Sequence, residues 1–167
     1  MGSAVAIAVA RELSERGLSV PRCVFVSGRQ APHRPFAEWS MRGLSDSQVL
    51  DALQRHYGGL PAEALANPEL IEMMLPVLRA DFALLESFPA TCPGPLPLPI
   101  VAIGGAEDPW AGAERLQTWQ MYSTMPLRSH HLPGGHFYLD DRLDDVLSIV
   151  RAECRGMQTA GAASPQA

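Results

Sequence analysis

Lysine is absent from this 167-residue chain, and cysteine is scarce. All 13 basic residues are arginine, and 18 acidic residues bring the formal net charge to −5. A chain of this charge offers no electrostatic footprint for nucleic acid or for an anionic membrane. The three cysteines, Cys23, Cys92 and Cys154, form no Cys-x-x-Cys pair and no even framework. We expect each to be a small apolar filler in a reducing compartment.

Long apolar runs are also missing, and no stretch reaches the length of a transmembrane helix. The apolar run 4–10 could pass for a signal-peptide core, but no basic segment precedes it and Arg11 and Glu12 follow at once. Met1-Gly2 is not a myristoylation start, because Ala6 stands where Ser or Thr is required. We therefore expect a cytoplasmic protein with no membrane partner.

The residues that are present alternate between buried-strand and helix patterns. With 47% apolar residues, the chain is long enough for one globular domain and too short for two. Apolar runs bounded by proline or glycine, and helical periodicity between them, predict strands at 22–28, 99–105 and 127–132 and helices at 3–17, 110–122 and 137–155. This alternation predicts an α/β fold, a mostly parallel sheet with helices on both faces.

The segment 37–88 interrupts the alternation with helices alone. An amphipathic pattern with Ser45 as N-cap predicts a helix over 45–57, and further helical pieces are expected at 61–66 and 68–88. We expect a helical insertion between two strands. Its unbranched and aromatic side chains could line an acyl channel, although such a stripe is more often core; they are Met41, Met73, Met74 and Phe82.

The domain is expected to span residues 1–155. Five prolines make 89–99 a stiff connector between the insertion and the next strand. Small and polar residues predict that 156–167 is a disordered tail.

Two expected strands end in paired glycines followed by a titratable side chain: Asp108 after one strand and His136 after the next. Taken alone, Asp108 before a proline is more simply a helix N-cap, and His136 a surface residue. The carboxyl ends of parallel strands meet at one edge of a sheet, where chemistry is usually located. The pair therefore predicts a carboxylate that fixes the tautomer of an imidazole and stabilises its protonated form.

The sequences Gly-Gly-Ala-Glu-Asp-Pro at 104–109 and Pro-Gly-Gly-His-Phe-Tyr-Leu at 133–139 resemble the acid and base motifs of type II thioesterases. These α/β-hydrolases accompany modular polyketide and nonribosomal peptide synthetases. Residues 26–33 resemble the strand and loop before the family's lid, and 75–82 resemble a lid helix. The resemblance runs from residue 1 to about residue 150. It implies a partial α/β-hydrolase fold with a helical lid, lacking the N-terminal strands.

The family's nucleophile elbow, Gly-x-Ser-x-Gly, is matched only in its last two positions, by Met1-Gly2. The resemblance implies a catalytic serine directly before Met1, whose backbone N–H would be an oxyanion donor. Ser3, Ser27 and Cys92 do not fit the elbow pattern. We therefore expect this chain to be inactive alone. It would be a fragment, the product of a mis-assigned start codon, or a truncated paralogue.

The resemblance implies hydrolysis of acyl thioesters on carrier-protein phosphopantetheine arms, with His136 as general base and Asp108 as its orienting acid. The implied partner is an acyl or peptidyl carrier protein, and no cofactor is implied. His130 and His131 face opposite sides of a strand, so no metal site is expected there. Two alternatives stay open: a non-catalytic paralogue that only binds carrier proteins or acyl chains, and an α/β-hydrolase acting on an ester, epoxide or lactone.

Overall fold

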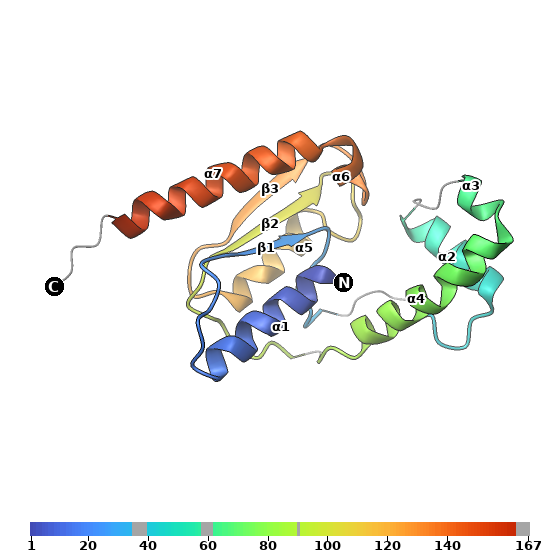
Figure 1. Ribbon diagram of the computed structural model, residues 1–167, viewed down its shortest axis with the longest axis horizontal. Helices are drawn as coiled ribbons and strands as arrows, with labels where there is room; N and C mark the ends of the chain where they lie inside the picture. The colour runs from blue at the N-terminus through green and yellow to red at the C-terminus, as the bar shows by residue number, and fades with distance from the viewer. Residues whose placement is uncertain (35–39, 58–61, 90, 163–167) are drawn as a thin grey trace.

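The computed structural model describes residues 1–34, 40–57, 62–89 and 91–162. Three parallel strands form one sheet in the order β1 (Val24–Ser27), β2 (Ile100–Gly105), β3 (Arg128–Leu132). The helices beside this sheet are α1 (Gly2–Glu15), α5 (Ala113–Gln117), the 3₁₀ helix η1 (Thr118–Tyr122), α6 (Tyr138–Asp141) and α7 (Leu143–Ala162). Figure 1 shows α1 and α5 on one face of the sheet and α7 along the other. The α/β fold class with helices on both faces is confirmed.

The central strand β2 is buried along its whole length. Ile100 and Ala102 pack in a core cluster with residues of α1, α5 and η1. Val101 and Ile103 point to the opposite face, in a cluster with Tyr138 and the partly buried apolar residues of α7. Each fully buried side chain of this size stabilises the fold by roughly 1.5–3 kcal/mol relative to exposure. Alternate side chains of β2 thus pack into the cores on the two faces of the sheet, which explains why this segment is apolar without interruption.

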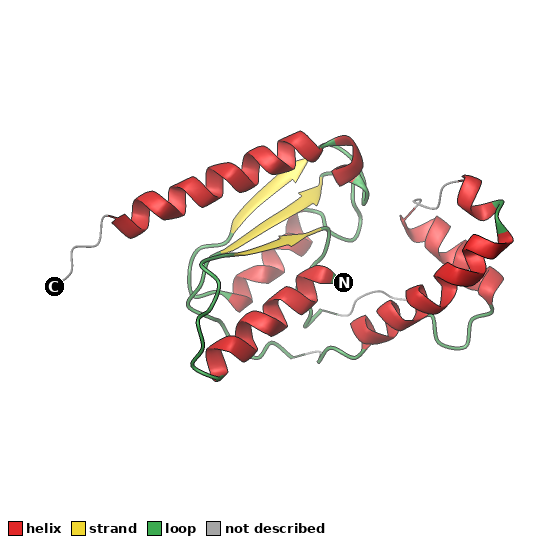
Figure 2. Cartoon of the chain, viewed as in Figure 1, coloured by secondary structure: helices red, strands yellow, loops and turns green. Residues whose placement is uncertain are grey.

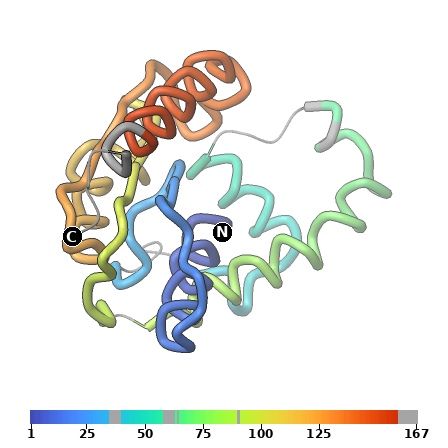
Figure 3. Tube along the Cα trace, turned by 60° about the vertical axis from the view of Figure 1, so that its left-hand side comes forward, coloured from blue at the N-terminus to red at the C-terminus, as the bar shows by residue number. Residues whose placement is uncertain are grey.

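Between β1 and β2 the chain forms α2 (Asp46–Tyr57), α3 (Ala62–Leu65) and α4 (Pro68–Glu86). Figure 2 shows these helices beside the sheet rather than on either of its faces, and Figure 3 shows the same arrangement from a second side. They share a small core of their own, made of Met41, Val49, Leu53, Leu75 and Phe82. The expected helical content of the insertion is therefore present among the described residues.

Polar contacts fix the ends of the insertion's helices. Ser45 and Gln48 exchange side-chain and backbone hydrogen bonds at 3.3 and 2.8 Å, which is a capping box at the start of α2. Asn67 caps α4, where Pro68 occupies the first helical position. Arg79 of α4 donates to the Leu44 carbonyl at 2.8 Å and so ties the loop before α2 to α4.

The helix expected over 110–122 starts later and changes type. Helix α5 begins only at Ala113, because the side chain of Asp108 accepts the N–H of Trp110 and holds the intervening residues in a turn. From Thr118 the chain continues as the 3₁₀ helix η1. The helix expected over 137–155 is likewise two helices, with a break at Arg142 between α6 and α7.

The disordered tail expected at 156–167 is wrong over its first part, because α7 continues to Ala162. Alanine, methionine and glutamine are good helix formers, and residues 156–164 contain no proline. Residues 163–167 lie outside the described residues.

The prediction that each cysteine is a small apolar filler is wrong for Cys154, which is exposed. Among the described residues, no helix combines the length and apolar character that a membrane crossing requires.

Candidate active site

The loop after β2 holds Asp108 with its side chain fully buried, at 0% exposure. One carboxylate oxygen, Oδ1, accepts the backbone N–H of Trp110 at 2.8 Å. The other, Oδ2, lies 2.8 Å from Nδ1 of His136. Asp108 is not the N-cap of α5, since that position is Gly112. The capping alternative for this residue is therefore replaced by a local turn that leaves one oxygen for the histidine.

Paired glycines allow the two loops to touch. A Cβ built on Gly105 would collide with the carbonyl oxygens of Gly134 and Gly135, so only glycine permits this approach. Gly134 has φ +118°, a conformation that other residues rarely adopt. Glu107 joins the loops further: its Oε2 accepts the N–H of Gly134 at 2.6 Å, and its own N–H donates to the Gly134 carbonyl at 3.1 Å.

His136 lies where the two loops meet, with 26% of its side chain exposed. Because Nδ1 faces Asp108, Nε2 is the nitrogen left for a substrate or a nucleophile. The ring of Tyr57, from the end of α2, lies 4.7 Å from the imidazole, centroid to centroid. The convergence of Asp108 and His136 that the strand-end pattern predicts is thus observed. Their catalytic role stays a prediction.

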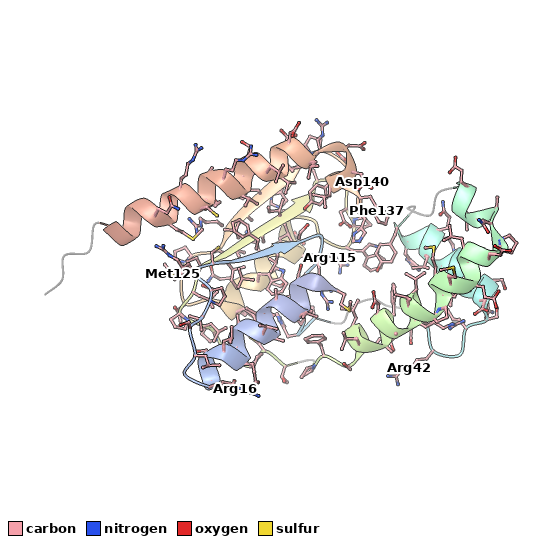
Figure 4. The ribbon with its side chains drawn as sticks, in the orientation of Figure 1. Arg16, Arg42, Arg115, Met125, Phe137 and Asp140 are labelled. Atoms are coloured by element: carbon pink, nitrogen blue, oxygen red, sulfur yellow. The ribbon has the colours of Figure 1, made fainter. Side chains whose placement is uncertain are left out.

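A pocket of about 390 Å³ opens beside His136. Its apolar wall comes from α2 and α4 and consists of Leu53, Leu78, Phe82 and Leu85. Phe137, labelled in Figure 4 at the end of the sheet nearest α2, also lines it. Two charged residues, Arg29 and Asp81, also line the pocket. The arrangement suits an apolar chain whose reactive end meets the imidazole.

Of the side chains expected to line an acyl channel, only Phe82 does so. Met41 lies in the core of the insertion, and Met73 points to solvent with 73% of its surface exposed. Met74 is not among the residues that line the pocket. Helical spacing identified the apolar stripe but not which of its members meets the sheet.

Burial sets the protonation of the groups around the pocket. Burial lowers the pKa of Arg29 to about 10, which leaves the guanidinium charged at neutral pH. Burial raises the pKa of Tyr57, and the negative charge of Asp108 raises it further. Burial likewise raises the pKa of Tyr138, whose hydroxyl lies 2.7 Å from Ser27 Oγ. Both phenols therefore remain protonated at neutral pH.

A family model described as "Thioesterase domain" matches residues 1–154. The chain belongs to the thioesterase domain family. It is 34% identical over 155 residues to the linear gramicidin dehydrogenase LgrE of Brevibacillus parabrevis, a match that covers 91% of this chain and 59% of that protein. The resemblance to type II thioesterases carried by residues 104–109 and 133–139 is confirmed by the solved structures that this chain is similar to.

One such structure is RedJ, the thioesterase from the prodiginine pathway of Streptomyces coelicolor, at 36% identity and a TM-score of 0.74. Another is YbtT, a type II thioesterase from the yersiniabactin pathway, at 29% identity and a TM-score of 0.74. Each match covers 87% of this chain and 59% of the other. The chain therefore spans about three-fifths of the length of these relatives.

Within this thioesterase domain, Met1 is the expected backbone oxyanion donor, a role that stays a prediction. It precedes the first turn of α1 and lines the pocket together with His136. The hydroxyl of Ser3 makes two structural hydrogen bonds: its Oγ donates to the Ser27 carbonyl and accepts the Ser27 N–H, both at 3.0 Å. These bonds fasten the start of α1 to the end of β1.

The sequence alone did not reveal Tyr57 and Trp110 as neighbours of His136 and Asp108. Tyr57 ends an ordinary amphipathic helix about 80 residues before His136, and nothing in its local pattern marks it. Trp110 directly follows Asp-Pro, and an indole so close to a candidate carboxylate was the one available signal. Arg29 was missed too, because its burial depends on packing beyond β1.

Proposed function

We propose that the complete protein hydrolyses acyl thioesters on the phosphopantetheine arms of carrier proteins and so removes stalled or wrong acyl groups from a polyketide or nonribosomal peptide synthetase. The observation that carries the proposal is the 2.8 Å contact between Asp108 and His136 at the mouth of an apolar pocket. YbtT, one of the proteins that this chain is similar to, is a type II thioesterase from the yersiniabactin NRPS/PKS pathway, and RedJ is a thioesterase from the prodiginine pathway.

In the proposed reaction a serine directly before Met1 attacks the thioester carbonyl, and its proton passes to Nε2 of His136. The backbone N–H of Met1 donates to the oxyanion that forms. Protonated His136 then gives its proton to the departing thiolate sulfur. A water molecule, deprotonated by His136, next attacks the acyl-serine. The serine oxygen leaves and takes the proton back from His136, which releases the carboxylic acid. Asp108 holds Nδ1–H throughout and stabilises each imidazolium.

The position of Met1 supports this assignment. It stands at the N-terminus of α1, where backbone N–H groups lack helical acceptors and the helix dipole favours negative charge. The bonds between Ser3 and Ser27 hold that helix end against the pocket. A residue just before Met1 would thus lie near both His136 and the oxyanion donors that the chemistry requires.

The experiment compares variants of the complete polypeptide on an acyl-carrier-protein substrate and on a short acyl thioester. His136→Ala is expected to lower kcat/KM by about 10²–10⁴-fold, as removal of a general base does. His131→Ala is the matched control, because this exposed histidine lies on β3 away from the pocket. Its activity should equal that of the unmodified protein. Near-equal rates for His136→Ala and the unmodified protein would reject the assignment.

The alternatives give different results in the same assays. Preferential cleavage of oxygen esters over matched thioesters would favour another α/β-hydrolase activity. In-frame codons for Gly-x-Ser directly before Met1 support the enzyme, whereas an in-frame stop favours a non-catalytic paralogue.

A further inference from the structure

Trp110 touches both the candidate catalytic carboxylate and the helical insertion. Its backbone N–H donates to Asp108 Oδ1 at 2.8 Å. Its indole Nε1–H donates to the carbonyl of His56 at 2.7 Å. One residue thus joins the loop after β2 to the last turn of α2.

The acceptor, the carbonyl of His56, lies in the last turn of α2. The last four carbonyls of an α-helix have no N–H within the helix to bond, and His56 is the penultimate residue of α2. The next residue, Tyr57, places its ring 4.7 Å from that of His136 and 6.1 Å from that of Trp110. The end of α2 therefore meets both loops of the active site, one through Trp110 and one through His136.

The indole ring of Trp110 also contacts Arg115 of α5, a helix that packs on the sheet. The guanidinium of Arg115, labelled in Figure 4, lies 5.4 Å from the centroid of the Trp110 ring. Arg115 also donates from Nη1 to Gln30 Oε1 at 3.0 Å. A cation over an aromatic face attracts it electrostatically, so the ring orientation is fixed independently of the helix that it binds.

We propose, on the basis of the thioesterase function above, that Trp110 is a positioning residue that fastens the last turn of α2 over the Asp108–His136 pair. The hydrogen bond from its indole N–H to the His56 carbonyl fixes the position of the end of α2. The hydrogen bond from its backbone N–H orients the Asp108 carboxylate. Seating of the helical lid and alignment of the acid are then coupled through one side chain. Breaking the indole bond releases the end of α2, withdraws Tyr57 from His136 and opens the pocket wall.

The test is Trp110→Phe in the complete protein, which removes the indole N–H and keeps an aromatic ring. Hydrogen exchange of the amides in the last turn of α2 is expected to accelerate about tenfold, the equivalent of one hydrogen bond. KM for a long-chain acyl thioester should rise several-fold, while KM for an acetyl thioester, which does not reach the wall, should change little. A merely structural residue would not separate these two substrates.

Trp119→Phe is the matched control, since its indole donates to the Arg29 carbonyl at 2.7 Å within the sheet core. It should lower thermal stability yet leave exchange in α2 unchanged relative to global unfolding. Unchanged α2 exchange and unchanged KM in Trp110→Phe would overturn the inference, even in a protein that hydrolyses thioesters normally. A protein that hydrolyses no thioester but shows the exchange effect would instead refute the proposed function and leave the contact standing.

A second measurement needs no variant. In the unmodified protein, the indole N–H resonance of Trp110 should exchange slowly with solvent and slow further when a long-chain acyl ligand fills the pocket. Exchange as fast as that of an unprotected indole would overturn the inference, whether or not Trp110→Phe folds.

Discussion

Asp108 uses each of its carboxylate oxygens for a different bond, one to the Trp110 N–H and one to Nδ1 of His136. In Asp108→Asn the amide NH₂ group must face either the Trp110 N–H, where two donors meet, or Nδ1 of His136. The second arrangement makes Nδ1 an acceptor and so stabilises the tautomer with its proton on Nε2, which cannot act as the base. We expect kcat of the complete protein to fall by about 10⁴-fold with KM little changed. Steady-state kinetics, with a thermal melt to confirm folding, measure this. A kcat close to that of the unmodified protein would show that His136 does not depend on Asp108.

Gly105 is a second residue on which the site depends. An alanine Cβ there would overlap the carbonyl oxygens of Gly134 and Gly135, and backbone atoms cannot move away as a flexible side chain can. Gly105→Ala should lower the free energy of unfolding by about 1–3 kcal/mol, measured in urea. Gly135→Ala is the matched control, because its Cβ would meet nothing within 4 Å. Equal losses in the two variants would contradict the close approach of the loops.

At the scale of elements, α2 depends on its capping box. Ser45→Ala removes the acceptor of the Gln48 N–H and is expected to lower the free energy of unfolding by about 1 kcal/mol. Ser47→Ala, inside the first turn, should cost less than half as much, because Ser47 Oγ contacts Ser45 Oγ at 3.1 Å but accepts no backbone N–H among the described residues. Urea unfolding of both variants tests this. A larger loss at Ser47 would show that the cap is not what stabilises the helix start.

Helices and strands could be predicted from the sequence where the local residue pattern determines their type and their ends. The uninterrupted apolar run at 100–105 and the Ser45 cap both lie where the sequence placed them. The late start of α5 was not foreseen, because the Asp108 side chain competes with the helix for the Trp110 N–H. The length of α7 was missed because a polar composition suggested disorder where alanine supports helix.

For the molecule as a whole, the sequence predicted that Asp108 and His136 converge, but it did not locate the pocket. Asp108 and His136 could be paired because parallel strands end at one edge, which is a rule of topology. Phe82 and Met73 lie on the same helix, yet one lines the pocket and the other is exposed to solvent. Which side of α4 meets the sheet is set by how the insertion docks. The docked insertion includes a hydrogen bond from the Trp110 indole to the His56 carbonyl, which no local pattern encodes.

Burial of His33 predicts how the stability of the whole molecule changes with pH. Its side chain is among the buried polar groups, and its Nδ1 has no hydrogen-bond partner among the described residues. Burial lowers the pKa of His33, and the charge of Arg34 lowers it further. The unfolded chain therefore takes up this proton at a higher pH than the native protein does. Stability from this group is complete above the ordinary value of 6.5 and falls as the pH drops toward the lowered pKa.

The corresponding experiment is urea unfolding between about pH 5 and 8 for the unmodified protein, His33→Gln and His131→Gln. A glutamine cannot take up the proton, so His33→Gln should show a shallower decline of unfolding free energy below pH 6.5 than the unmodified protein. His131→Gln is the matched control, because His131 is an exposed histidine on β3. Carboxylates and the remaining histidines contribute equally to all three proteins, and their effect cancels in the comparison. Parallel curves for all three would mean that His33 takes up its proton at the same pH in the folded and unfolded chains, which contradicts the cost of burying it beside Tyr122.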